Sequence, residues 1–206
     1  MRNIYNILLI CIGLLSATTL SAQTAEEWIK NLNATLGASY TMGATVELGG
    51  DAAADQGQLN GLFMVADDSY YLSLGKMEVY SDGKLRYEVN NERKEVTVDR
   101  VDLTSHDILT NPTNAFRFAS DEFDMSLLGV DDGKATISLV PRQDMGITDI
   151  ELTLRRHADG GVVPAVVSYN YDGDIIRITL DMHPNDAKLP RWDKTAYRAY
   201  DVVSFI

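Results

Sequence analysis

Alternating apolar and polar positions run through most of this chain and predict a protein built mainly of β-strands. The alternation is clearest over residues 40–48, where Met42 and Val46 fall on one side of the pattern, as in a strand with one buried face. Over residues 61–99, short runs rich in β-branched and aromatic residues end at Asp, Asn or Gly clusters, which is typical of strands joined by tight turns.

The later strands of this meander have one apolar and one mostly polar side. The residues on the apolar side are Met77, Val79, Leu85, Tyr87, Val89, Val96 and Val98. We therefore expect a sheet with one apolar face, which needs a cover or a ligand.

A short amphipathic helix is predicted before the sheet, and a second irregular segment interrupts it. Thr24 and Glu27 have the spacing of a capping box, and Trp28 and Leu32 follow at helical spacing. The alternation breaks over residues 103–120, where an Asn-Pro pair predicts one or two short helices that could form a lid. Strand patterns then resume at residues 123–130, 135–141, 150–154, 163–170, 175–180 and 202–205. The whole predicts one antiparallel domain of about eleven strands with few helices.

The first 22 residues have the features of a secretory signal peptide. Arg2 precedes an apolar run over residues 7–15, and small residues lead to Ala22, after which we expect cleavage. Cys11 lies inside the apolar run behind a bulky residue, which disfavours a lipoprotein signal. We therefore expect a mature domain of residues 23–206, outside the cytoplasm and without disulfides, because Cys11 is the only cysteine. No later run approaches the ~20 apolar residues of a membrane span, so stable membrane insertion is not expected.

The charge balance excludes some classes of partner. The chain has 18 Lys and Arg against 30 Asp and Glu, a formal net charge of −12. Phosphate backbones and anionic lipid surfaces would repel such a protein, which argues against nucleic-acid binding and polybasic membrane docking.

Candidate catalytic and metal-binding residues are sparse. His106, His157 and His183 are far apart in the sequence and lack metal-ligand spacing, and nucleophile-elbow and phosphate-loop motifs are absent. Acidic residues cluster in loops and turns, at Asp51 and Asp55, at Asp131 and Asp132, and at Asp172 and Asp174. Hairpin turns favour Asp for their own geometry, so we expect no catalytic residues, no metal and no cofactor.

Several segments together resemble the outer-membrane lipoprotein carrier proteins (LolA-like). The sharpest is the hairpin over residues 79–90, which contains Ser81-Asp82-Gly83-Lys84 and is similar to the central block of that family. Further similar features are the run Gly61-Leu62-Phe63-Met64-Val65, the strand Glu95-Val96-Thr97-Val98, the N-terminal helix, the helical break near Pro112, Leu139-Val140-Pro141, and Trp192 ahead of Val202-Val203.

The resemblance implies an unclosed antiparallel barrel of about eleven strands, with an N-terminal helix and short lid helices over an apolar cavity. It also implies a periplasmic carrier that holds lipoprotein acyl chains in the cavity and moves them toward the outer membrane. Such a carrier is expected to be a monomer that meets membrane-bound donor and acceptor proteins. The residues expected to line the cavity are Trp28, Leu32, Val46, Leu72, Val79, Tyr87, Val98, Phe116, Leu139, Leu152 and Ile178.

One departure from the family concerns the lid. Family members commonly have Arg-Pro after the strand that corresponds to residues 61–65, and that arginine helps to latch the lid, whereas this chain has Asp67 and Asp68. A carboxylate cannot donate the hydrogen bonds that a guanidinium donates. Either the latch is different here, or the ligand is another lipid-like molecule.

Two alternatives remain open. An exported, non-enzymatic module that binds a protein partner predicts a packed interior with an exposed edge strand or apolar patch. An acidic hydrolase predicts two carboxylates that face one cleft.

Overall fold

The described residues form one α-helix and twelve β-strands. The computed structural model describes residues 23–49, 58–171 and 173–206, so the expected signal peptide and the loop with Asp51 and Asp55 lie outside them. The helix is α1 (Ala25–Leu36), and the strands are β1 (Ser39–Leu48), β2 (Leu59–Ala66), β3 (Ser69–Leu74), β4 (Met77–Ser81), β5 (Leu85–Asn90), β6 (Glu95–Arg100), β7 (Phe123–Asp131), β8 (Lys134–Pro141), β9 (Ile147–Arg156), β10 (Val162–Tyr171), β11 (Asp174–His183) and β12 (Asp201–Ser204).

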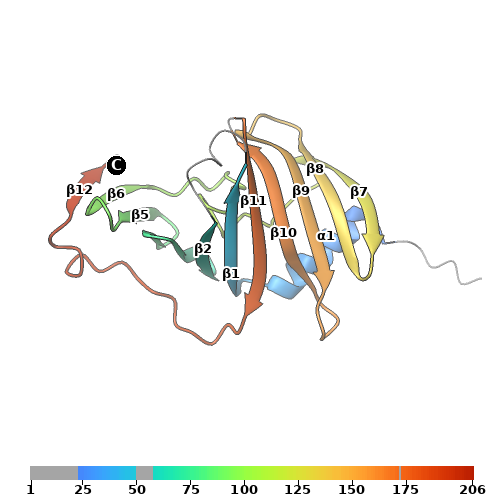
Figure 1. The fold of residues 1–206 in the computed structure, drawn as a ribbon, viewed down its shortest axis with the longest axis horizontal. Coiled ribbons are helices and arrows are strands. Elements are labelled where there is room, and N and C mark those ends of the chain that lie inside the picture. The colour runs from blue at the N-terminus through green and yellow to red at the C-terminus, as the bar shows by residue number, and fades with distance from the viewer. Residues whose placement is uncertain (1–22, 50–57, 172) are drawn as a thin grey trace, which may run out of the picture.

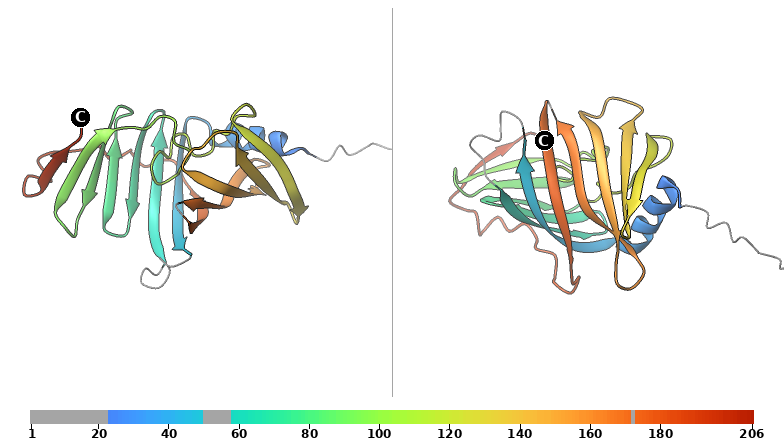
Figure 2. Two further views of the ribbon diagram at one scale, coloured as in Figure 1. Left: turned by 90° about the horizontal axis from the view of Figure 1, so that it is seen from above. Right: turned by 45° about the vertical axis from the view of Figure 1, so that its right-hand side comes forward.

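All twelve strands of the described chain belong to one open sheet. Their order is β12-β6-β5-β4-β3-β2-β1-β11-β10-β9-β8-β7, so β12 and β7 are the two edges. Neighbouring strands are antiparallel, except that β12 runs parallel to β6. The sheet curls at its β7–β10 end and extends away through β2–β6 (Figures 1 and 2). The expected unclosed antiparallel sheet is confirmed, with twelve strands instead of about eleven.

Two predicted hairpin turns have the required backbone geometry. Asp132 and Gly133 join β7 to β8 with φ values of 44° and 72°, which are the left-handed conformations of a two-residue hairpin. Between β4 and β5, the Asp82 carboxylate accepts hydrogen bonds from two following amides, at 2.9 and 2.8 Å. Gly83 has φ 86° and lies against Asp68, where a Cβ would approach the Asp68 Cβ to 2.9 Å, so only glycine fits this turn.

The predicted capping box starts α1. The Thr24 hydroxyl accepts from the Glu27 amide at 3.2 Å, and the Glu27 carboxylate accepts from the Thr24 amide at 3.2 Å. The helix buries Trp28, Ile29 and Leu32 against the sheet, mainly on β10 (Figure 1). We call the sheet face under α1 the inner face. No helix in the described ranges is long and apolar enough to cross a membrane.

The prediction of one continuous apolar face from Met77 onward is wrong. Val79 is opposite Glu88 in the β4–β5 register, whereas Tyr80 is opposite Tyr87, which in turn is opposite Val98. Because paired residues share a face, the apolar side is the inner face in β4 but the outer face in β5 and β6. Val79 and Tyr80 are both buried, so the apolar surface changes sides at this strand.

The C-terminal segment covers the outer face of β4–β6. Residues 184–200, which we call the strap, run from the end of β11 to the far edge of the sheet (Figure 1). The Trp192 ring stacks on Tyr87 at 4.8 Å and on Tyr197 at 5.0 Å. Together with Val89 and Val96, these rings form a second apolar cluster, separate from the inner one.

The expected short lid helices do not form. Residues 103–120, which we call the roof, contain successive turns whose amides bond to carbonyls three residues earlier, as in Asn114 to Asn111 at 3.2 Å. The Asp107 carboxylate accepts from the Leu109 amide at 3.0 Å and from the Thr110 hydroxyl at 2.6 Å. Such side-chain bonds compete with helical backbone bonds, so the roof forms turns.

Candidate functional site

The candidate site is the apolar interior between the inner face, α1 and the roof. It contains the main buried cluster of the described chain, to which the helix contributes residues such as Leu32, the roof residues such as Phe116, and the strands most of the others. Nine of the eleven predicted lining residues lie in this cluster and are at most 2% exposed: Trp28, Leu32, Val46, Leu72, Val79, Phe116, Leu139, Leu152 and Ile178. Tyr87 and Val98 instead lie on the outer face under the strap, so the eleven do not share one interior.

Side chains of the protein itself fill this interior. A void of about 20 Å³ lies between α1, Tyr40, Val65 and Phe116. A void of about 10 Å³ lies between His106, Phe118 and β9–β10. Neither holds more than a water molecule, so the cavity expected from the resemblance is occupied in this structure. A ligand could enter only if the roof or α1 moved.

A larger groove lies at the edge of the interior, between α1 and the end of the roof. Its volume is about 370 Å³, within the range of small-molecule sites. Its walls combine apolar and polar side chains: Glu26, Ile29, Lys30, Asn33, Phe118, Ser120 and Met125. Ile29 and Phe118 also belong to the buried cluster, so the groove borders the interior.

Three tyrosine hydroxyls attach the roof to the sheet. Tyr40 of β1 donates to the Pro112 carbonyl at 2.6 Å, and Tyr70 of β3 donates to the Thr110 carbonyl at 2.9 Å. Tyr169 of β10 donates to the Asp107 carboxylate at 2.6 Å. Apart from bonds at the two ends of the roof, these are the hydrogen bonds that join it to strands in the described chain. Apolar packing and three hydroxyls therefore hold the roof closed.

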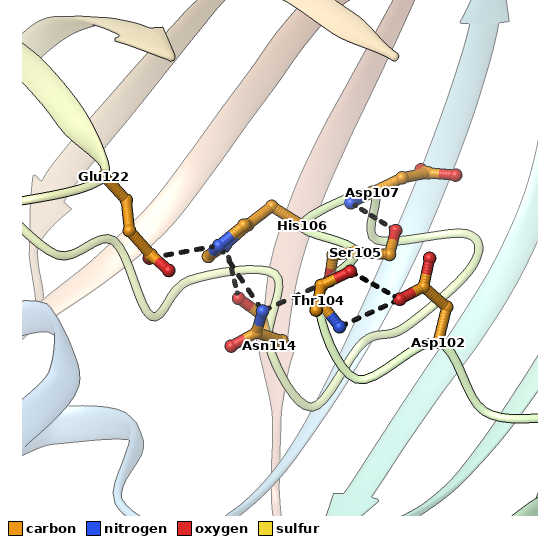
Figure 3. A network of polar contacts seen from close by, with 7 residues as sticks. All are labelled: Asp102, Thr104, Ser105, His106, Asp107, Asn114 and Glu122. Carbon is orange, nitrogen blue, oxygen red and sulfur yellow. Dashed lines mark hydrogen bonds and ion pairs between the residues drawn. The ribbon is translucent and has the colours of Figure 1, made fainter. Parts of the chain in front are cut away.

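A separate polar network stabilises the roof internally (Figure 3). The His106 ring is 6% exposed; it donates through Nδ1 to the Asn114 carbonyl at 3.1 Å and lies 3.5 Å from the Glu122 carboxylate. It stacks on Phe118 at 5.6 Å and contacts Phe123 edge-on at 5.0 Å. His106 thus ties both ends of the roof together.

Burial sets the ionisation of these groups. It lowers the pKa of His106, and the nearby Glu122 carboxylate and the Asn114 carbonyl oppose the change only in part, because a charged imidazole loses hydration here. Burial likewise raises the pKa of Tyr40, Tyr70 and Tyr169. All three phenols are therefore protonated donors at neutral pH.

Asp67 and Asp68, where the resemblance predicts a lid latch, are exposed in the turn between β2 and β3. Asp67 has φ 53°, and its amide donates to the Ala38 carbonyl at 2.8 Å. In the hydrogen bonds of the described residues neither carboxylate reaches the roof. The three tyrosines connect the roof to the sheet instead. The sequence analysis did not identify them, because a tyrosine that points inward from a strand is equally typical of an ordinary hydrophobic core. Their only signal was a hydroxyl at an inner-face position of a strand.

Among the other candidate residues, His157, His183, Asp131 and Asp132 are exposed in the described chain. In the part of the chain that the structure describes, no group of His, Cys, Asp and Glu side chains is placed to hold a metal ion. Asp131 and Asp132 are exposed in the β7–β8 turn, and the His157 ring pairs with Asp159 at 3.1 Å near the surface. The turn at Asp172 is only partly within the described residues.

The geometry defines a class of protein: an open antiparallel sheet whose apolar inner face is covered by one helix and an irregular roof. No family model and no curated protein matches the sequence. Solved structures of similar shape include an uncharacterized conserved protein from Thermus thermophilus, with TM-score 0.49, 13% identity and coverage of 88% of this chain and 99% of that one.

Two further similar structures have descriptive names. One is a LolA superfamily protein from Nitrosomonas europaea, with TM-score 0.40, 9% identity and coverage of 85% of this chain and 98% of that one. The other is a putative outer membrane lipoprotein-sorting protein domain from Vibrio parahaemolyticus, with TM-score 0.42, 9% identity and coverage of 85% and 94%. At these values, the function of this chain has to be inferred from its own residues.

Proposed function

We propose that this protein is an exported, non-enzymatic carrier that binds acyl chains between the sheet and the roof. One observation carries the proposal: the cover of the apolar inner face is not part of the sheet. The roof reaches the strands through three side-chain hydrogen bonds. Elements with few bonds to the remaining structure open at low free-energy cost, so the roof can move while the sheet stays intact.

The hydrophobic effect supplies the driving force for such a carrier. Opening the roof exposes Phe116 and Phe118, which are 2% and 7% exposed when it is closed. An acyl chain that takes their place gains about 0.8 kcal/mol for each buried CH₂. A chain of about ten buried CH₂ groups can therefore offset the displacement of several roof side chains, and no catalytic group is needed.

The cellular role that we propose follows from the signal-like N-terminus and the resemblance to the lipoprotein carriers. The protein acts in the periplasm as a monomer and transfers acyl chains of lipoproteins, or another lipid, from a membrane-bound donor to a membrane-bound acceptor. The groove between α1 and Phe118 is the proposed entry. The strongly acidic chain would avoid anionic membrane surfaces, as suits a carrier that must leave each membrane.

Native mass spectrometry of the purified exported protein tests the proposal. Wild-type protein should carry one lipid or lipopeptide or take one up on mixing. Phe118→Asp, which puts a charge at the groove and the interior, should lose the lipid. Phe205→Asp is the matched control, because Phe205 is 68% exposed beside β12. Folding of both variants is verified by circular dichroism, and a folded wild type that binds no lipid contradicts the proposal.

A protein-binding module is the second candidate, and the C-terminal edge favours it. The filled interior agrees with that alternative, and Val202, Val203, Phe205 and Ile206 are 40–68% exposed at this edge. Edge strands with exposed apolar residues can pair with a strand of another chain. A photo-crosslinker at position 203 should then capture a specific protein in cells, whereas one at exposed Tyr171 should not.

A further inference from the structure

Three buried phenol groups project from the sheet toward the roof. Tyr40, Tyr70 and Tyr169 are 6%, 0% and 3% exposed and belong to the buried cluster of the inner face. Tyr40 and Tyr70 lie in one cross-strand row, on either side of Val65. Each hydroxyl is thus a fixed donor on a largely apolar face, on which Ser81 and Arg86 also lie in the row of Tyr70.

The three acceptors all belong to the roof. Two are main-chain carbonyls only two residues apart, at Thr110 and Pro112, and the third is the carboxylate of Asp107. If the roof moves away and a pure hydrocarbon replaces it, all three donors lose their roof acceptors, and the hydrocarbon offers none in exchange. A buried donor without an acceptor is unfavourable. A hydrocarbon therefore replaces the apolar contacts of the roof but not its three hydrogen-bond acceptors.

We propose that Tyr40, Tyr70 and Tyr169 determine the class of ligand, by donating to carbonyl oxygens of an acyl ester or amide in place of the roof oxygens. The inference rests on the proposed carrier function and adds the chemistry that the ligand must have. In this proposal, carbonyl oxygens of the ligand take the positions that the Thr110 and Pro112 carbonyl oxygens have in the closed roof. They then accept from Tyr70 and Tyr40. An alkyl chain without such oxygens binds less tightly.

Burial and charge around the three hydroxyls are consistent with this role. Besides Tyr169, the Asp107 carboxylate accepts from the Leu109 amide and the Thr110 hydroxyl, so its charge stays satisfied within the roof when the roof moves. The Tyr169 hydroxyl, by contrast, has the Asp107 carboxylate as its hydrogen-bond partner and loses this bond when the roof moves. Arg86 lies in the same cross-strand row as Tyr70. Its Nη2 pairs with Glu88 at 2.8 Å, whereas its buried Nε has no hydrogen-bond partner among the described residues, so Arg86 is a further, charged donor beside Tyr70.

Two probes of equal chain length, methyl oleate and 1-octadecene, test the inference. Each displaces an environment-sensitive naphthylamine dye from wild-type protein, with both probes delivered from cyclodextrin. We expect the ester to bind about tenfold more tightly than the hydrocarbon, equivalent to ~1.4 kcal/mol. Tyr40→Phe and Tyr70→Phe should each reduce this preference severalfold, by weakening the ester and not the hydrocarbon.

Tyr71→Phe is the matched control, because Tyr71 is the neighbour of Tyr70 on the opposite face and bonds to Glu78 instead. This variant should keep the wild-type preference. Equal affinity of wild type for the two probes overturns the inference and leaves the carrier function standing. If neither probe displaces the dye, both fail. The wild-type comparison decides the matter even where a Phe variant does not fold.

Discussion

At the scale of single residues, Glu78 is the polar anchor of the outer face. Its carboxylate accepts from Tyr71 at 2.9 Å, Tyr80 at 3.2 Å, Asn91 at 3.0 Å and Tyr197 at 3.0 Å. Burial alone would raise the pKa of Glu78, but the hydrogen bonds from Asn91 and the tyrosines outweigh it and lower the pKa. One carboxylate thus connects the strap to three segments of the sheet.

Glu78→Gln should weaken the attachment of the strap. An amide cannot accept four hydrogen bonds, so we expect a loss of about 1–3 kcal/mol in the free energy of unfolding at pH 7, measured with guanidinium.

A lowered carboxyl pKa stabilises the fold above the ordinary value of 4.5, and this contribution is lost as the pH falls through the folded-state pKa. The variant should therefore lose less stability than wild type in that acid range. Glu92→Gln, at an exposed residue, is the control.

His106 should make the roof sensitive to mild acid. Its pKa is lowered by burial, so the folded protein binds the proton less readily than the unfolded chain does. The stability that results is complete above pH 6.5 and declines as the pH falls from there toward the folded-state pKa. Amide exchange in the roof should speed up as the pH falls below 6.5, when corrected for intrinsic rates. His106→Gln should reduce that change and exposed His157→Gln should not; an unchanged pH dependence in His106→Gln contradicts this role.

At the scale of elements, the capping box gives α1 its N-terminal boundary and should be measurable. Thr24→Ala removes the acceptor for the Glu27 amide and should lower the free energy of unfolding by about 1 kcal/mol. Thermal and guanidinium unfolding measure the change. Lys30→Ala, at an exposed position of the same helix, should stay within about 0.5 kcal/mol of wild type. Equal losses in both variants would show that the cap has no special role.

The elements themselves could largely be predicted from the sequence, because a period of two and a capping box are local signals. The strand over residues 40–48 and the Asp132-Gly133 turn are confirmed on such signals. The change of apolar face was missed because Val79 and Tyr80 are both apolar, so only the pairing with β5 decides which of them faces inward. That register is a nonlocal property.

The roof could be placed but not described from the sequence. Its boundaries follow from the break in alternation, whereas its turns depend on bonds that Asp107 makes to neighbouring backbone and side chains. The attachment by Tyr40, Tyr70 and Tyr169 was missed for another reason. These residues lie on three strands, and their hydroxyls bond to roof atoms that are far away in the sequence. Such contacts can be recognised only in the folded structure.

At the scale of the whole molecule, stability should be distributed unevenly between the sheet and its cover. Strand β1 is paired on both sides, with β2 and β11. Roof amides such as those of Asn114 and Arg117 bond only to carbonyls three residues earlier. Regions with exposed or short-range backbone bonds open without global unfolding, so roof and sheet should exchange amide hydrogens in different free-energy ranges.

Hydrogen exchange followed by mass spectrometry measures that difference without any ligand. Amides at 109–117 should exchange at least ~100-fold faster than those of β1, because local opening of the roof leaves the strand ladder intact. Tyr70→Phe removes one of the three attachments and should speed up exchange in the roof about tenfold, with no change in β11. Tyr71→Phe should leave the roof as in wild type. Equal protection of roof and β1 would mean that they open as one unit, and an acyl chain could then enter only by unfolding the sheet.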